Sequence, residues 1–165
     1  MAAEGGPSPG GVIRKPTLAE VQGIKRLIDD TVVQDGAMLS RTLIELCENI
    51  RDFQVYVDED GVGGCCALHV EMADLAEIRS LAVRRELRAR GLGVRLLRAC
   101  LNEAAELGLP RVYALTRAPE FFGKQGFREV EMHELPHKVF RDCVRCALFP
   151  ECDEVAMVLD LPASG

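Results

Sequence analysis

The sequence lacks any apolar run long enough to cross a bilayer, which argues against an integral membrane protein. Its N-terminus, MAAEGGPSPGG, contains neither the apolar stretch of a signal peptide nor the arginines of a transit peptide. We therefore expect a cytoplasmic protein. Residues 1–11 should be disordered, because Gly, Pro and Ala there bury too little surface to offset the entropy of ordering.

The chain has no excess of positive charge, because its net charge is −6. This argues against general nucleic-acid binding. The chain has no internal repeat and no linker. Its 165 residues, 48% of them hydrophobic, are enough for one core, so we expect a single domain over residues 12–165. In a reducing compartment the seven cysteines should be thiols or metal ligands and not a disulfide framework.

Hydrophobic periodicity predicts strands and helices interspersed around a mixed sheet. The expected strands lie at 12–17, 53–57, 62–72, 76–83, 111–116, 127–132 and 155–161. A capping box, Thr17 with Glu20, should start one helix, and a second should follow Ser40 with Cys47 on its buried side. The clearest helix is expected over 91–107, and a helical turn over 119–124.

Positive charge is concentrated in one segment of this acidic chain. Between residues 79 and 98, seven arginines are opposed only by Glu86, a local net charge of +6 (seven minus one): Arg79, Arg84, Arg85, Arg88, Arg90, Arg95 and Arg98. Such a run is usually a solvated helix face. The glycines that lie within it favour an anion site instead.

Those glycines form the pattern Arg88-x-x-Gly91-x-Gly93, between a strand that ends at Val83 and a helix. Glycines allow a ligand to approach the backbone, and the start of a helix presents unpaired N–H groups, so the pattern suits a pyrophosphate. A dinucleotide fingerprint would need a third glycine at Leu96, and the Gly-Lys-Ser/Thr of a Walker A loop is absent.

Residues 76–97 resemble the acetyl-CoA-binding motif of the GCN5-related N-acetyltransferase (GNAT) family, and FFGKQGF at 121–127 is similar to that family's aromatic turn. The resemblance implies an α/β fold with a mixed, mostly antiparallel sheet, flanked by helices and splayed between its fourth and fifth strands. Acetyl-CoA would be the co-substrate in that opening, with its pantetheine arm along Leu81, Ala82 and Val83. Its pyrophosphate would lie on the backbone of the loop and helix start formed by Arg88, Ala89, Arg90, Gly91, Leu92, Gly93 and Val94.

A narrower resemblance covers most of residues 38–136. The segments LSRTLIELCENIRDFQV, GGCCALHV, AEIRSLAV and LGLPRVYALT look like the acetyltransferase domain of bacterial N-acetylglutamate synthases, in the short stand-alone form. This implies transfer of acetyl to the α-amine of L-glutamate, the first step of arginine biosynthesis. The expected partner is thus a small molecule and not a nucleic acid or membrane, and a homodimer is left open.

Three charged residues receive roles within this resemblance. Glu77 is the expected general base, because an amine must lose a proton before or during its attack on the thioester. Arg41 and Arg79 are the expected ligands of the glutamate carboxylates, since a guanidinium binds a carboxylate in a bidentate manner. Arg79 is two residues from Glu77, so both should point to the same face of the strand. The alternative for each is an ordinary surface residue.

Two further residues are assigned to the site with an alternative left open. Phe122 stands where many members of the wider family have a tyrosine that reprotonates the CoA thiolate, and phenylalanine cannot donate a proton. Phe122 is therefore expected only to line the cofactor site. Thr116 is expected to offer a hydroxyl to the substrate, unless it simply ends its strand.

The cysteines near the C-terminus allow a metal but do not predict one. Cys143, Cys146 and Cys152 form a Cys-x₂-Cys-x₅-Cys cluster compatible with a zinc knuckle, but no second Cys-x-x-Cys exists, and we interpret them as reduced thiols. Two other functions remain open. One is a GNAT enzyme for another small amine or a peptide N-terminus, and the other is a non-catalytic module that senses acyl-CoA or metal.

Overall fold

The computed structural model describes residues 10–35, 38–135 and 154–162. They form a seven-stranded sheet in the order β1-β2-β3-β4-β5-β7-β6. The strands are β1 (Val12–Arg14), β2 (Phe53–Asp58), β3 (Gly61–Met72), β4 (Leu75–Val83), β5 (Arg111–Thr116), β6 (Arg128–Val130) and β7 (Val155–Asp160). All neighbours are antiparallel except β4 and β5, which are parallel. The predicted mixed, mostly antiparallel sheet is confirmed.

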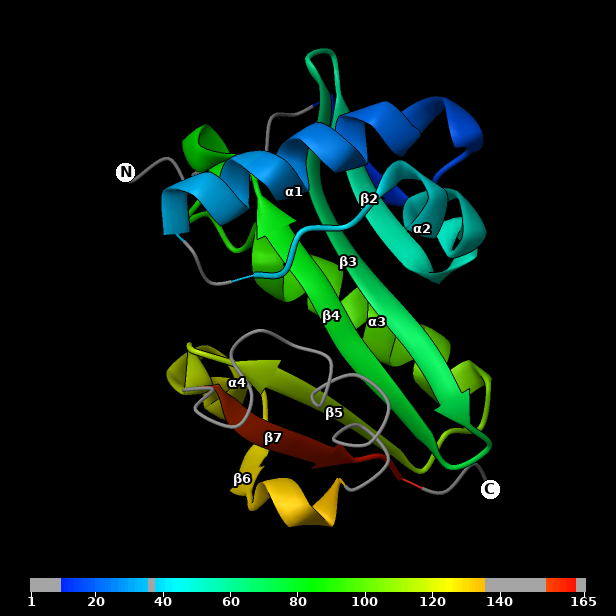
Figure 1. The fold of residues 1–165 in the computed structure, drawn as a ribbon, viewed down its shortest axis with the longest axis vertical. Coiled ribbons are helices and arrows are strands. Elements are labelled where there is room, and N and C mark those ends of the chain that lie inside the picture. The colour runs from blue at the N-terminus through cyan, green and yellow to red at the C-terminus, as the bar shows by residue number, and fades with distance from the viewer. Residues whose placement is uncertain (1–9, 36–37, 136–153, 163–165) are drawn as a thin grey trace.

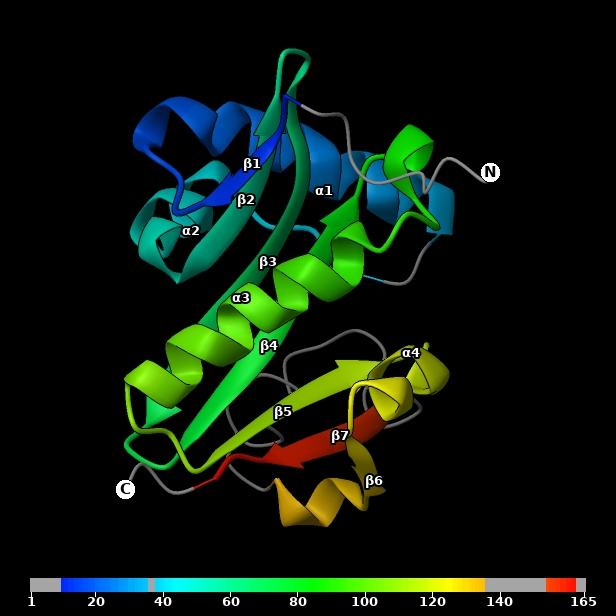
Figure 2. The ribbon, with the colours of Figure 1, turned by 180° about the vertical axis from the view of Figure 1, so that it is seen from behind.

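Helices cover both faces of this sheet. They are α1 (Val21–Asp35), α2 (Leu43–Glu48), α3 (Leu92–Glu106) and α4 (Pro119–Lys124). Helices α1 and α2 lie on one face (Figure 1), and α3 and α4 lie on the other (Figure 2). Each side has its own apolar core, with Ile24 and Ile28 of α1 buried on one side and Leu96 and Leu97 of α3 on the other. None of the helices in the described ranges is long and apolar enough to cross a membrane.

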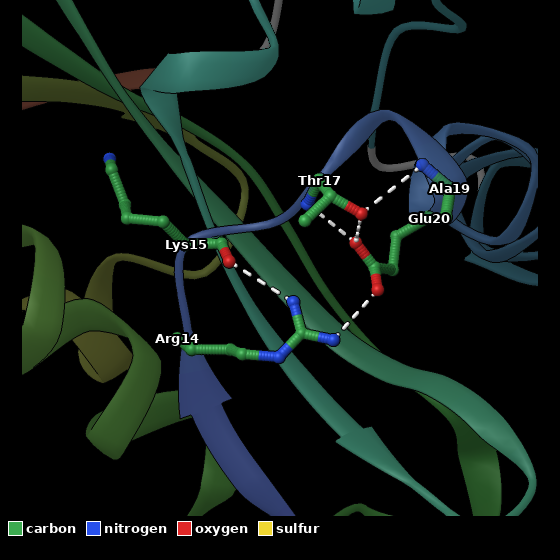
Figure 3. A network of polar contacts seen from close by, with 5 residues as sticks. All are labelled: Arg14, Lys15, Thr17, Ala19 and Glu20. Carbon is green, nitrogen blue, oxygen red and sulfur yellow. Dashed lines mark hydrogen bonds and ion pairs between the residues drawn. The ribbon is translucent and has the colours of Figure 1, made fainter.

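The predicted capping box at the start of the first helical segment is present. The Thr17 side chain accepts a hydrogen bond from the backbone of Ala19, and the Glu20 carboxylate accepts one from the backbone N–H of Thr17. Arg14, at the end of β1, binds the other oxygen of Glu20 at 2.7 Å (Figure 3). This guanidinium contact, with the bonds from Thr17, lowers the pKa of Glu20 to about 2. The network thus fixes the angle between the first strand and α1.

The opening between the fourth and fifth strands is also present. Strands β4 and β5 pair only at Ala76 with Val112 and at Glu77 with Tyr113. Beyond these pairs the strands diverge, as Figure 1 shows, while β5 continues to pair with β7. The edge of β4 from 78 to 83 that faces away from β3 is therefore unpaired by any strand in the described ranges, and its backbone groups border the opening.

A bulge in β4 changes which residues face each side. Cys65 pairs with Ala82 and Ala67 pairs with Arg79, so β4 carries one residue more than β3 in this stretch. The backbone accommodates it at Ser80, which has a left-handed φ of 56°. A one-residue insertion inverts the alternation of side chains. Ile78 and Leu81 therefore both contact the core beneath α3, although simple alternation would separate them.

Three details differ from the sequence-based expectation. The first strand ends at Arg14 and not at residue 17, because Thr17 caps the helical segment that follows. The strand expected over 127–132 is shorter, because the chain turns into a 3₁₀ segment at Met132–Glu134 after β6. Cys47 is exposed on α2, whereas Cys100 is buried on α3 as expected. A helix of only six residues gives too short a pattern to define its buried face. The cysteine cluster at Cys143, Cys146 and Cys152 lies outside the described residues, as do residues 1–9 of the predicted disordered lead-in.

Candidate active site

The opening of the sheet begins at Glu77, the last residue of β4 that pairs with β5. Glu77 is only 4% exposed, and its Oε2 lies 3.8 Å from Nη1 of Arg79. The expectation that both side chains share one face of the strand is confirmed. That face is the one covered by α2, because the residues opposite them on β3 are His69 and Ala67, and Ala67 packs in the core with α1 and α2.

The loop between β4 and α3 has the backbone of an anion site. Ala89 and Gly91 both have left-handed φ values, of 62° and 78°. Backbone turned in this way groups successive N–H donors on a concave side. Gly91 is the N-cap residue of α3 and provides no side-chain cap, and no acidic residue occupies the first turn. The N–H groups at the start of this helix are therefore available to a ligand.

The space around this loop is open enough for a ligand to approach the backbone. A Cβ at Gly91 would have no atom within 4 Å, and one at Gly93 would lie 3.7 Å from the ring of Phe121, an ordinary contact. The fold itself therefore does not need a glycine at 93. Close approach of a ligand to the backbone would explain why one is present there.

Two arginines of the predicted cluster are held in ion pairs near this loop, and others are exposed. Arg84 pairs with Asp58 at 3.2 Å, and Arg88 pairs with Asp35 of α1 at 3.2 Å. Arg88 also donates from Nε to the carbonyl of Val83 at 3.0 Å, so it ties the loop to the end of β4. The remaining arginines outside β4 are exposed: Arg85, Arg90, Arg95 and Arg98. They can contribute positive potential toward phosphate groups in solution.

A pocket of about 220 Å³ lies between the α2 segment and the face of β3 and β4 that carries Arg79. Its lining residues are Arg41, Glu45, Leu46, Asn49, Phe53, His69, Arg79 and Ser80. Arg41 and Arg79, 38 positions apart in sequence, thus contribute to one cavity. Two guanidinium groups in a partly buried pocket can bind two carboxylates of a small molecule.

The chain matches the model of the acetyltransferase (GNAT) family over residues 26–127. The chain belongs to this family. It is 39% identical over 149 residues to an uncharacterized N-acetyltransferase of Chlorobaculum tepidum, across 90% of this chain and 96% of that protein. It is 35% identical over 137 residues to an amino-acid acetyltransferase of Mycobacterium tuberculosis, across 81% and 78%.

A solved structure agrees with this assignment. The N-acetylglutamate synthase of Neisseria gonorrhoeae, complexed with coenzyme A and N-acetyl-glutamate, matches this GNAT chain with a TM-score of 0.79 and 27% identity. The match covers 92% of this chain and 35% of the synthase. The chain therefore spans about one third of the length of that synthase.

Phe121 and Phe122, the two adjacent rings of the aromatic turn, lie in different surroundings. Phe122 is 6% exposed and packs edge-on against Phe121 and Phe127, with ring centroids 5.1 Å apart in both pairs. Phe121 is the ring that lies beside Gly93. Phe121 thus lies beside the start of α3, after the loop from β4, while Phe122 forms part of the core. Sequence reasoning favoured Phe122 because the family alignment pointed to that position.

Thr116 ends β5, and its Oγ1 accepts a hydrogen bond from the backbone N–H of Ala118 at 2.8 Å. This hydroxyl therefore holds the turn that leads into α4, which agrees with the alternative that the residue ends its strand. Among the described residues no group of three or more His, Cys, Asp or Glu side chains could hold a metal ion.

Sequence reasoning missed several polar residues of the pocket. Thr42 and Glu45 form a second capping box at the start of α2, and Glu45 lines the cavity. The signal, Thr-x-x-Glu, was present in the sequence. His69 carries no such signal, because its partner Asp52, whose Oδ2 lies 2.7 Å from Nδ1, is 17 residues away. Only the pairing of β2 with β3 brings these two side chains together.

Proposed function

We propose that this GNAT acetyltransferase transfers the acetyl group of acetyl-CoA to the α-amine of L-glutamate. The observation that carries the proposal is the shared pocket of Arg41 and Arg79. A dicarboxylic amino acid needs two cationic contacts of fixed geometry, and the arginine fork supplies them. The related amino-acid acetyltransferase of Mycobacterium tuberculosis and the glutamate-product complex of the Neisseria synthase support the same acceptor class.

Acetyl-CoA is the donor used by this family, and the neighbouring synthase was crystallised with coenzyme A. In our proposal the backbone N–H groups of the loop around Gly91 and Gly93 hold the pyrophosphate. The unpaired edge of β4 from Leu81 to Val83 binds the pantetheine arm and polarises the thioester carbonyl. The acetyl carbon then lies in the opening of the sheet near Glu77, where the paired part of β4 and β5 ends.

The reaction in this proposal is a direct transfer through a ternary complex. Glu77 accepts a proton from the acceptor ammonium group, directly or through water, and the amine attacks the thioester carbon. The carbon–sulfur bond breaks, CoA leaves as its thiolate, and the acylated nitrogen loses its second proton to water to give the amide. Since Phe122 has no proton to donate and is buried in the core, water or another group protonates the thiolate, or it leaves as the anion.

Steady-state kinetics with acetyl-CoA and a panel of amino acids tests the proposal. Glutamate should be the best acceptor, with glutamine and aspartate poorer, because each alters the charge or reach of the distal group. Replacing Arg41 or Arg79 with Ala should lower kcat/KM for glutamate about 10- to 150-fold, the effect of losing one charged hydrogen-bonded contact worth about 1.5–3 kcal/mol. The dissociation constant for acetyl-CoA should stay nearly unchanged.

The matched control is Arg26→Ala, which removes an exposed arginine from α1 and should leave the kinetics as in the parent. Far better use of a different amine, or parental glutamate kinetics in both pocket variants, would refute glutamate as the acceptor. Binding of acetyl-CoA without any CoA release in the presence of amino acids would support the non-catalytic sensor.

A further inference from the structure

His69 and Asp52 form a polar pair at the edge of the candidate acceptor pocket. Nδ1 of His69 lies 2.7 Å from Oδ2 of Asp52, and His69 itself lines the cavity. A carboxylate that accepts a hydrogen bond from Nδ1 fixes the tautomer and leaves Nε2 as the basic nitrogen. Because Nδ1 is engaged by Asp52, Nε2 is the ring nitrogen left to take a proton.

His69 is also the direct neighbour of Glu77 across the sheet. The two residues form a registered pair between β3 and β4, so their side chains point to the same face. Residues paired in this way have Cβ atoms about 4.5–5.5 Å apart, within reach of two long polar side chains. Glu77 is 4% exposed, whereas the His69 side chain is 22% exposed. The histidine beside this nearly buried carboxylate therefore keeps contact with solvent.

Burial of Glu77 creates a difficulty that this neighbour can resolve. A base that takes a proton in each turnover must release it before the next, and a side chain with little solvent contact has few partners for that release. Of the residues that line the pocket, His69 is the one with an imidazole, a group that can accept a proton at one nitrogen and pass it on. Arg41 and Arg79 remain protonated throughout.

We propose that His69, oriented by Asp52, is the relay through which the proton taken by Glu77 leaves the site; this rests on the proposed acetyl transfer to an amine. In the first step an N–H bond of the acceptor ammonium breaks and an O–H bond forms on Glu77. In the second, that O–H bond breaks and an N–H bond forms at Nε2 of His69. The imidazolium, stabilised by the carboxylate of Asp52, then loses the proton to water.

The other charged groups around the imidazole fit this route. Arg79 faces it from β4 beside Glu77, and Arg41 and Glu45 face the same pocket from the α2 segment. Asp52, from the 3₁₀ segment Ile50–Asp52, holds the ring from its Nδ1 side.

Chemical rescue distinguishes a relay from a structural histidine. His69→Ala should lower kcat about 100-fold with the best amino-acid acceptor, the lower end of typical proton-transfer contributions. KM for the acceptor and binding of acetyl-CoA should change less than about threefold. Added imidazole should restore part of kcat in this variant in a concentration-dependent way and have no effect on the parent. Asp52→Asn should lower kcat in the same direction while His69 is retained.

His133→Gln is the matched control, since His133 is exposed in the segment after β6 and should leave the kinetics unchanged. A His69→Ala protein with parental kcat, or a loss of kcat that imidazole does not restore, would overturn the relay. In either case, turnover of glutamate by the parent protein would still support the proposed function. Absence of amino-acid turnover in the parent would overturn the proposed function, and with it the relay.

Discussion

Gly93 offers the cleanest test of the donor site, because the fold does not require a glycine there. It lies in the first turn of α3, its φ is not left-handed, and an added Cβ would meet only the Phe121 ring at 3.7 Å and Val83 at 3.9 Å. Gly91 is a poorer choice, since its φ of 78° would strain a side chain whether or not a ligand binds.

Gly93→Val should therefore keep or slightly raise the melting temperature. Glycine is about 0.8–1.0 kcal/mol less favourable than alanine within a helix, and valine lies between the two. The branched side chain should nevertheless occupy the space through which a pyrophosphate approaches the backbone amides. Loss of one charge-assisted hydrogen bond, about 1.5–3 kcal/mol, weakens binding about 10- to 150-fold.

Calorimetric titration with acetyl-CoA, together with thermal unfolding, measures both quantities. Gly93→Ala is the matched control, because a single added methyl group would meet its neighbours only at ordinary contact distances, and its affinity should stay within a few fold of the parent. Parental affinity in a folded Gly93→Val protein would refute the placement of the pyrophosphate on this loop. A large fall in melting temperature would refute the argument that the fold tolerates a side chain here.

Two further predictions concern stability and thiol reactivity. Because contact with Arg14 lowers the pKa of Glu20 from 4.5 to about 2 in the folded protein, its stabilisation is present above pH 4.5 and is lost as the pH falls toward 2. Glu20→Gln should make the melting temperature depend less on pH over this range. A pH dependence equal to that of the parent would contradict the ion pair. Among the described cysteines, native-state alkylation at pH 8 mapped by mass spectrometry should label exposed Cys47, whereas burial raises the pKa of Cys65 to about 12 and keeps it unmodified. Labelling of Cys65 before Cys47 would contradict this.

The parts of the fold that the sequence predicted are those defined by residues close together in the chain. The glycines at 91 and 93, the capping box of Thr17 and Glu20, and the strand over 111–116 each depend on a few neighbouring residues. The glycine at 108, which adopts a left-handed φ of 79°, likewise ends α3 where expected. Local chemistry determines such features, so a single sequence contains the information.

The acceptor pocket was predicted less completely, because it depends on which residues of separate strands face each other. The contact of His69 with Asp52 requires the pairing of β2 with β3. The left-handed conformation of Ser80 had no signal, since serine is not a residue type that marks positive φ. Only Arg41 and Arg79 were identified there, and the family resemblance, more than any pattern in the residues, indicated them.

The bulge at Ser80 connects the two halves of the site. Before it, Glu77 and Arg79 point to the face that α2 covers, where the acceptor pocket lies. After it, Leu81 and Val83 point to the opposite face, and Val83 lies beside Gly93 at the start of α3. Without the extra residue, all four side chains would point to the face that α2 covers, and Val83 would no longer lie beside Gly93 at the start of α3. A left-handed residue other than glycine costs about 1–2 kcal/mol, and this strain lets one strand present side chains to both the pocket and the start of α3.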